Sequence, residues 1–258
     1  MNILDEIIAA KRKEIKEYND TQPVAADKFP EKSRLADRLR QGRGVIAEIK
    51  RASPSKGDIR LDVDVAAQAK IYEQAGAAAI SVLTDELYFK GSMVDLEKVS
   101  QLVSVPVLCK DFIVDRVQID RAKNAGATII LLIVAALEQG ELEELFVYAQ
   151  ASGLEVLVEV HDRAELQIAV ELGAELIGVN NRNLKTFEVS LQQTAHIAKH
   201  FPENSHSLLI SESGISSEGD AEFAFSTGAN GVLVGEALMR SQDAGAWISA
   251  VTSSGVQK

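Results

Sequence analysis

The sequence predicts an α/β protein of the (β/α)8 type, a TIM barrel with an additional N-terminal helical segment. A Gly-Ala pair stands where a helix-like stretch ends and an apolar run begins, and it recurs four times with a period of about fifty residues. A further apolar run lies between successive pairs, so that eight apolar runs alternate with helix-like segments. The length of 258 residues suits one such barrel, which typically needs about 250 residues.

The eight apolar runs are the predicted strands. Glycine favours the left-handed conformation at helix ends, and runs rich in Val, Ile and Leu are typical of buried parallel strands. An open doubly wound sheet gives the same alternation, but eight units with a repeat of two favour closure into a barrel. The Gly-Ala pairs are Gly76-Ala77, Gly126-Ala127, Gly173-Ala174 and Gly228-Ala229, and the runs between them cover residues 45–47, 105–109, 154–158 and 207–210.

The segments between the strands have helical periodicity. Their apolar positions include Leu142, Leu145, Phe146 and Ala149 in one segment, and Ala164, Leu166, Ala169 and Val170 in the next. We expect residues 1–258 to form one domain, with residues 1–43 as a helical extension packed on the barrel. Two amphipathic stretches predict the helices of this extension, the first with Ile3, Ile7, Ile8 and Ile15, the second with Leu35 and Leu39. Glu14 and Glu17 follow the basic cluster at residues 11–13, which indicates a solvated helix face.

Composition excludes several classes of partner. The formal net charge of −11 argues against nucleic acid and anionic membranes, which clustered Lys and Arg bind. The longest apolar run, residues 127–137, is shorter than the roughly 20 residues of a membrane helix. One cysteine excludes an internal disulfide, and the histidines show no metal-ligand grouping; His196 and His200 fit a surface helix. We expect a cytoplasmic monomer without a metal site.

Polar side chains follow five of the predicted strands. In a TIM barrel the C-terminal strand ends converge on one opening, where the chemistry takes place. Glu48 and Lys50 are two residues apart, so they point to the same face of the first strand. Buried charges are expected to pair with one another or with a ligand. The strand-end residues are Glu48, Lys50, Lys110, Glu159, Asn180 and Glu212.

The loops after strands seven and eight predict a phosphate site. Barrels often bind phosphate there through backbone N–H groups and the N-terminus of a short helix. Gly214 and Gly235 lie just beyond these two strand ends and allow the backbone to approach a ligand. Ser213 precedes the first glycine; Glu236 follows the second, and it would contribute its N–H with its carboxylate directed away.

Two further loops border the predicted opening. Residues 51–58, after the first strand, are polar and rich in turn formers, which is typical of a mobile cover. Residues 84–92, after the second strand, contain Tyr88 and Phe89. Such aromatic rings either stack on a flat ligand or pack on the barrel.

Five motifs in order along residues 46–239 resemble the indole-3-glycerol-phosphate synthase family: AEIKRASPS at 47–55, CKDFI at 109–113, VEVHD at 158–162, GVNNRNL at 178–184 and SESGI at 211–215. The resemblance implies an enzyme, a carboxy-lyase of tryptophan biosynthesis. It would convert 1-(2-carboxyphenylamino)-1-deoxyribulose 5-phosphate into indole-3-glycerol phosphate with loss of carbon dioxide and water. No metal or redox cofactor is implied. Glu236 departs from the small residue, sometimes Ser, of the family.

The resemblance also implies roles for the site residues. Lys110 would be the general acid on the substrate ketone, with Glu159 stabilising a cationic intermediate and Glu48 and Lys50 serving dehydration. The other expected catalytic residues are Asn180 and Glu212. The expected substrate-binding residues are Ser53, Phe89, Phe112, Leu131, Arg182, Leu184, Ser213, Gly214, Gly235 and Glu236.

Three alternatives remain open at this point. Phosphoribosylanthranilate isomerase would share the phosphate loops, but it is expected to use a Cys and Asp pair, and Cys109 should point outward because it precedes Lys110. A different enzyme would use Lys110 as the nucleophile of an imine. A barrel that binds a phosphorylated ligand without turnover is the third alternative.

Overall fold

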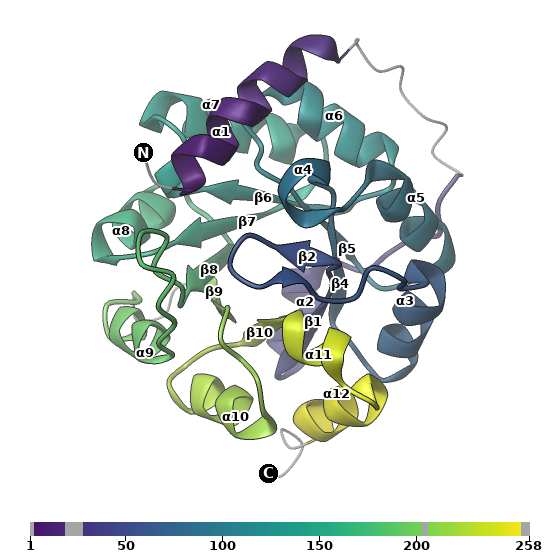
Figure 1. The fold of residues 1–258 in the computed structure, drawn as a ribbon. Coiled ribbons are helices and arrows are strands. Elements are labelled where there is room, and N and C mark those ends of the chain that lie inside the picture. Colours follow the sequence, from purple (N-terminus) through teal and green to yellow (C-terminus); the bar gives the residue numbers. More distant parts are fainter. Residues whose placement is uncertain (1–2, 19–27, 203–205, 254–258) are drawn as a thin grey trace.

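Eight parallel strands form a closed barrel in the computed structural model, which describes residues 3–18, 28–202 and 206–253. The order around the barrel is β1-β10-β9-β8-β7-β6-β5-β4 (Figure 1). A separate hairpin, β2 (Ala52–Ser53) with β3 (Gly57–Asp58), follows β1. The barrel strands are β1 (Gly44–Ile49), β4 (Ala79–Leu83), β5 (Val107–Lys110), β6 (Ile129–Ile133), β7 (Glu155–Val160), β8 (Leu176–Asn180), β9 (Leu208–Glu212) and β10 (Gly231–Val234).

Strand β1 closes the barrel because it pairs with both the second and the last barrel strand. Gly44 is opposite Gly231 of β10, and Ile46 is opposite Ala79 of β4. An open sheet would leave two unpaired edges. The prediction of a TIM barrel is therefore confirmed, and the open doubly wound sheet is excluded.

Most of the helices surround the barrel on its outer face (Figure 1). The four Gly-Ala glycines all have positive φ, from 77° at Gly173 to 109° at Gly228, as expected where a helix ends and the chain enters a strand. The helices are α1 (Ile3–Glu14), α2 (Leu35–Gln41), α3 (Val65–Gln74), α4 (Glu86–Phe89), α5 (Met93–Leu102), α6 (Arg116–Asn124), α7 (Gln139–Ala151), α8 (Arg163–Glu171), α9 (Gln192–Ala198), α10 (Glu218–Ser226), α11 (Glu236–Arg240) and α12 (Ala244–Ser253), with short 3-10 turns η1 (Ile15–Glu17) and η2 (Val134–Ala136).

Side chains alternate between the interior of the barrel and the layer beneath the helices. Leu108 belongs to the apolar cluster inside the barrel, whereas Cys109 belongs to the cluster between strands and helices. The prediction that Cys109 points outward is confirmed, and Lys110 follows the parity of Leu108. The apolar positions predicted for one helix, Leu142, Leu145, Phe146 and Ala149, are all buried. In the next helix Leu166 and Ala169 are buried and Val170 is partly buried. Ala164 is exposed, so the prediction that it lies on the buried face was wrong.

The first two helices lie at opposite ends of the barrel. Helix α1 lies at the end viewed in Figure 1, together with the β2–β3 hairpin, and α2 lies beyond the strands. Leu39 of α2 packs against Gly44 and Gly231, the first residues of β1 and β10. The N-terminal helical segment of the prediction is therefore present; its residues 1–2 and 19–27 lie outside the described part of the chain.

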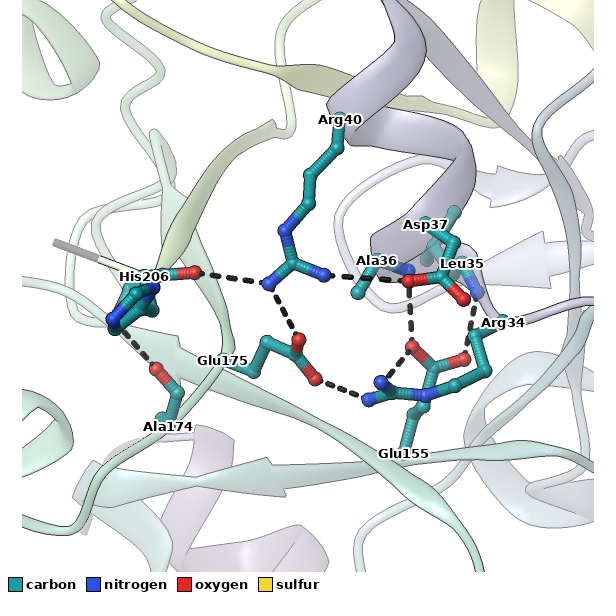
Figure 2. A network of polar contacts seen from close by, with 10 residues as sticks. Arg34, Leu35, Ala36, Asp37, Arg40, Glu155, Ala174, Glu175 and His206 are labelled. Carbon is teal, nitrogen blue, oxygen red and sulfur yellow. Dashed lines mark hydrogen bonds and ion pairs between the residues drawn. The ribbon is translucent and has the colours of Figure 1, made fainter.

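Helix α2 is held on the barrel by a network of polar contacts (Figure 2). The buried carboxylate of Glu155, the first residue of β7, accepts hydrogen bonds from the N–H groups of Leu35 (2.7 Å) and Ala36 (3.0 Å). Arg34 pairs with Glu155 at 3.7 Å and also with Glu175, which Arg40 contacts at 2.6 Å. Glu155 therefore satisfies helix N–H groups that no side chain of the helix caps.

Replacing Glu155 with glutamine should lower the free energy of unfolding by about 1–2 kcal/mol, because the amide keeps only one acceptor oxygen for two N–H groups. Denaturant titration measures this loss. Glu222→Gln is the control: it weakens an exposed pair with Arg43 and should change stability by less than about 0.5 kcal/mol. Equal effects of the two variants would contradict the capping role.

Within residues 3–18, 28–202 and 206–253, no helix is both long and apolar enough to cross a membrane. The longest apolar run of the sequence forms β6 and η2.

Candidate functional site

A cavity of about 1020 Å³ opens at the C-terminal ends of the strands. We call it the mouth cavity. Every residue predicted for the site lines it, although these residues come from strands and loops far apart in the sequence. They are Glu48, Lys50, Ser53, Phe89, Lys110, Phe112, Leu131, Glu159, Asn180, Arg182, Leu184, Glu212, Ser213, Gly214, Gly235 and Glu236.

Lys110, at the end of β5, is the centre of a buried polar cluster. Its Nζ lies 2.5 Å from Glu212 Oε2 and 3.3 Å from Glu159 Oε2. Asn180 donates from Nδ2 to the other Glu159 oxygen at 3.0 Å. Strands β5, β7, β8 and β9 thus each direct one side chain to the same point, as the strand-end pattern predicted.

The charges of this cluster shift one another's pKa values. Burial alone would lower the pKa of Lys110, but the carboxylates of Glu212, Glu159 and Glu48 outweigh burial and raise it. Burial raises the pKa of Glu212, and the nearby carboxylates raise it further. Glu159 has a lowered pKa because Lys110 and His161 outweigh its burial. One ammonium therefore serves two carboxyl groups, of which Glu159 is the one that stays ionised.

Gly178 makes room for the Glu212 side chain inside the barrel. A Cβ at position 178 would collide with Glu212 Oε1, an atom that is buried without a hydrogen-bond partner among the described residues. Glycine in a strand interior often marks such a close approach. Gly178 was not among the predicted site residues, although a glycine within an apolar strand was an available signal for it.

Glu48 and Lys50 form a second charged pair beside the first. Lys50 Nζ lies 2.5 Å from Glu48 Oε1, and Ser81 donates to the other Glu48 oxygen at 3.5 Å. A Cβ at Gly235 would collide with Glu48 and lie 3.1 Å from Lys50 Nζ. The pair therefore lies directly against the backbone of the loop after β10.

The loops after β9 and β10 present backbone to the cavity. Ser213 and Gly214 have φ of 66° and 84°, and Gly235 precedes α11. Arg240 and Lys56 contact the Glu236 carboxylate at 3.1 and 3.8 Å, which holds it at the rim. This is the arrangement in which TIM barrels bind phosphate.

Arg182 is the cation of the cavity with no carboxylate within 4 Å among the described residues. The side-chain Nη1 of Arg182 donates to the carbonyl oxygen of Phe187 at 3.2 Å, and the backbone N–H of Arg182 donates to Asn180 Oδ1 at 3.0 Å. Burial lowers the pKa of Arg182, and Glu236 partly offsets this. A guanidinium held by backbone contacts remains available to an anionic group of a ligand.

Another part of the cavity lining is apolar. The rings of Phe89 and Phe112 lie 5.9 Å apart, tilted by 37°, and Leu131 and Leu184 extend this wall. Tyr88 instead points away and donates to Glu6 of α1 at 3.2 Å. Phe89 therefore lines the cavity and Tyr88 contacts the first helix, and stacking of Phe89 on a flat ligand stays a prediction.

Helix α1 contributes Ile3, Leu4 and Ile7 to the mouth cavity. These three residues were not predicted to line the cavity, because the sequence of an amphipathic helix does not reveal which part of the barrel the helix covers. Their apolar spacing was the only signal.

The prediction of a solvated face at residues 11–13 was wrong for Lys11. Its side chain is 1% exposed and lies 2.9 Å from Asp85, 3.1 Å from Asp111 and 2.9 Å from Glu14. Thr84 donates to Asp111 at 2.7 Å. Lys11 thus connects α1 to the loops after β4 and β5, and Asp111 directly follows Lys110.

The hairpin predicted as a cover, β2–β3, contributes Ser53 and Lys56 to the cavity wall. Its mobility stays a prediction.

Comparison with known proteins places the chain in a family. The family model of indole-3-glycerol phosphate synthase matches residues 4–251. A protein named indole-3-glycerol phosphate synthase from Exiguobacterium sibiricum is 53% identical over 256 residues, covering 97% of each chain. One of the same name from Bacillus cereus (strain AH820) is 54% identical over 239 residues, covering 93% of each.

Among solved structures, thiamine phosphate pyrophosphorylase from Pyrococcus furiosus is similar with a TM-score of 0.61 and 18% identity, over 85% of this chain and 96% of that one. This likeness supports the barrel fold alone. The family model and the two relatives each cover more than nine-tenths of the chain, and the chain therefore belongs to the indole-3-glycerol phosphate synthase family.

Proposed function

We propose that this protein is a carboxy-lyase that closes the pyrrole ring of 1-(2-carboxyphenylamino)-1-deoxyribulose 5-phosphate to give indole-3-glycerol phosphate. Family membership supports this reaction. The observation that carries it is that the ammonium of Lys110, whose side chain is 13% exposed, lines the same cavity as the rings of Phe89 and Phe112 and the glycine-bearing loops at Gly214 and Gly235. The apolar part and the glycine-bearing loops match the aromatic ring and the phosphate of the substrate.

Lys110 is the general acid in this proposal. The aromatic carbon that carries the carboxylate attacks the ketone carbon, a carbon–carbon bond forms, and Lys110 protonates the ketone oxygen. The aromatic ring is restored when carbon dioxide leaves. Preorganised charge at the oxygen that becomes negative lowers the barrier. Arg182 is the cation suited to the substrate carboxylate, because no protein carboxylate lies within 4 Å of it in the described residues.

Dehydration completes the reaction. The new hydroxyl takes up a second proton and leaves as water, while the neighbouring carbon gives up one proton, so each turnover consumes one proton from the solvent. The Glu48 and Lys50 pair, 2.5 Å apart, supplies an acid and a base for these two transfers. Glu159, held ionised, stabilises positive charge on the substrate nitrogen. Asn180 and Glu212 orient Glu159 and Lys110, and Ser53 borders the same cavity.

The environment of Lys110 favours an acid over an imine-forming nucleophile. Imine formation needs the neutral amine, which burial or a second cation favours. Two carboxylates within 3.3 Å favour the ammonium instead. Cys109 lies behind the strand, where burial raises its pKa to about 12, and this environment does not suit the Cys and Asp chemistry of an isomerase.

The test supplies the carboxyphenylamino-deoxyribulose phosphate and follows indole fluorescence. We expect a signal that depends on enzyme and substrate, and its absence with folded protein would remove the proposal. Borohydride added with substrate should leave no mass adduct on Lys110.

We also propose a single domain over residues 1–258 and a cytoplasmic monomer. The one free thiol, Cys109, suits a reducing compartment. Light scattering measures the mass of the protein in solution.

A further inference from the structure

His161 lies next to the mouth cavity without lining it. It directly follows β7, its side chain is 15% exposed, and its ring lies between two carboxylates. Nε2 is 3.4 Å from Glu159 Oε1, and Nδ1 is 3.0 Å from Glu165 Oε2. The ring therefore connects helix α8, which carries Glu165, to a carboxylate of the candidate site.

The backbone of His161 fixes the position of this ring. Its N–H donates to Glu165 Oε2 at 2.7 Å, and its carbonyl oxygen accepts from Gln193 Nε2, on α9, at 2.5 Å. Residues outside the cavity thus hold His161 on two sides, and a ligand need not contact it.

Both ring nitrogens face carboxylate oxygens: Nδ1 is within hydrogen-bond distance of Glu165, and Nε2, which makes no hydrogen bond among the described residues, is at ion-pair distance from Glu159. This placement favours the doubly protonated imidazolium. A neutral imidazole carries one N–H, so its other nitrogen would direct a lone pair at a carboxylate oxygen. Burial alone would lower the pKa of His161, but the neighbouring carboxylates of Glu159 and Glu165 outweigh burial and raise the pKa to about 10. The placement between two carboxylates and the raised pKa both favour a cationic His161 at neutral pH.

This cation distinguishes the two carboxylates that share Lys110. Glu159 is faced by Lys110 from β5, by Asn180 from β8 and by His161, whereas Glu212 on β9 has Lys110 as its only ion-pair partner among the described residues. Without His161 the two carboxylates would compete for one ammonium. With it, Glu159 keeps its charge and Glu212 is the group that takes up a proton.

We propose that His161 is a positioning residue for the reaction: as an imidazolium clamped between Glu165 and Glu159, it fixes the orientation and negative charge of Glu159 from outside the cavity. This inference rests on the proposed function and deepens it. Glu159 then acts as a fixed negative charge in every step, and proton transfer falls to Lys110, Glu48 and Lys50.

Kinetic variants test the inference. His161→Gln keeps one donor and loses the charge. We expect kcat to fall about 10- to 100-fold, the range seen when outer partners of metal-ligating residues are removed, with KM changed less than twofold. The acidic limb of the pH profile of kcat/KM should move upward by about one unit or more, because Glu159 loses a neighbouring cation. Glu165→Gln should produce the same shift with a smaller amplitude.

The matched control is His196→Gln on α9. His196 is exposed and outside the cavity, so its profile should equal that of the unmodified protein. Imidazole added to His161→Ala should restore part of kcat without changing that of the control. A His161→Gln profile with an unmoved acidic limb would overturn the inference, and lowered stability with an unmoved limb would assign His161 a purely structural role.

Nitrogen NMR on protein with labelled histidine gives a readout that needs no substrate. The signal lost in His161→Gln should show both ring nitrogens protonated at pH 8, and a neutral ring there would overturn the inference even if the enzyme is active. A protonated ring in a protein that forms no indole would instead contradict the proposed function alone.

The pH dependence of protein stability provides an independent test of the charge on His161. Because the folded pKa of His161, about 10, lies above the ordinary histidine value of 6.5, its contribution to stability is complete below about pH 6.5 and disappears as the pH rises through 10. The stability difference between the unmodified protein and His161→Gln should therefore shrink between pH 7 and 10. A constant difference over this range would contradict the charged ring.

Discussion

Lys110→Ala should lower kcat by about 10²- to 10⁴-fold, the range that one well-placed acid or oxyanion donor contributes. The variant removes the cation that lies 2.5 and 3.3 Å from two carboxylates at the centre of the mouth cavity. KM should change far less, because the phosphate loops and the apolar wall are untouched. Steady-state kinetics by indole fluorescence provide the measurement.

Lys123→Ala is the matched control for this variant. Lys123 is an exposed lysine on α6 that does not line the cavity, and its loss should leave kcat unchanged. Circular dichroism checks that Lys110→Ala folds; we expect it to fold because Glu212, whose pKa is already raised, can take up a proton in place of the lost ion pair. Near-normal turnover of Lys110→Ala would refute the acid role.

Lys11→Met should lower the free energy of unfolding by about 3–5 kcal/mol, the cost of breaking a buried ion pair by removing one partner. The methionine has a similar volume but leaves Asp85 and Asp111, whose side chains are 2% and 12% exposed, without their cation. Because Asp111 also accepts the N–H of Phe112 at 2.7 Å, its displacement should raise KM and lower kcat as well.

Denaturant titration measures the loss of stability, with Lys13→Met as control. Lys13 is exposed on the same helix, so its replacement should cost less than about 0.5 kcal/mol. Adding Asp111→Asn to Lys11→Met should cost less than the sum of the two single variants, with a coupling of about 0.5–3 kcal/mol. Strict additivity would show that the two side chains do not interact in the folded protein.

The barrel could be predicted because its signals are local and repeated. Each Gly-Ala pair marks the end of one helix and the approach to one strand, and strand parity alone separates Cys109 from Lys110. The strand-end charges could be predicted for the same reason: eight parallel strands bring their C-terminal ends together. Roles within the site came from family resemblance, since spacing does not tell an acid from an electrostatic partner.

The remaining site residues depend on contacts between distant segments. Nothing in residues 3–14 tells which loops α1 will cover, so Ile3, Leu4 and Ile7 were missed and Lys11 was assigned to solvent. A lysine beside Glu14 is ordinarily exposed, and its burial follows only from two aspartates more than seventy residues away. His161 appeared in the sequence only as part of a motif. Its contact with Glu165, which lies in the first turn of α8, could not be predicted from the motif.

The two N-terminal helices, one at each end of the barrel, constrain the order in which the molecule assembles. Lys11 pairs with Asp111, which lies 100 residues later in the chain. Leu35 of α2 binds Glu155, which lies 120 residues later. At synthesis rates of about 5–20 residues per second, this separation is a delay on the order of ten seconds. The first helices made therefore cannot complete these contacts until β5 and β7 have left the ribosome.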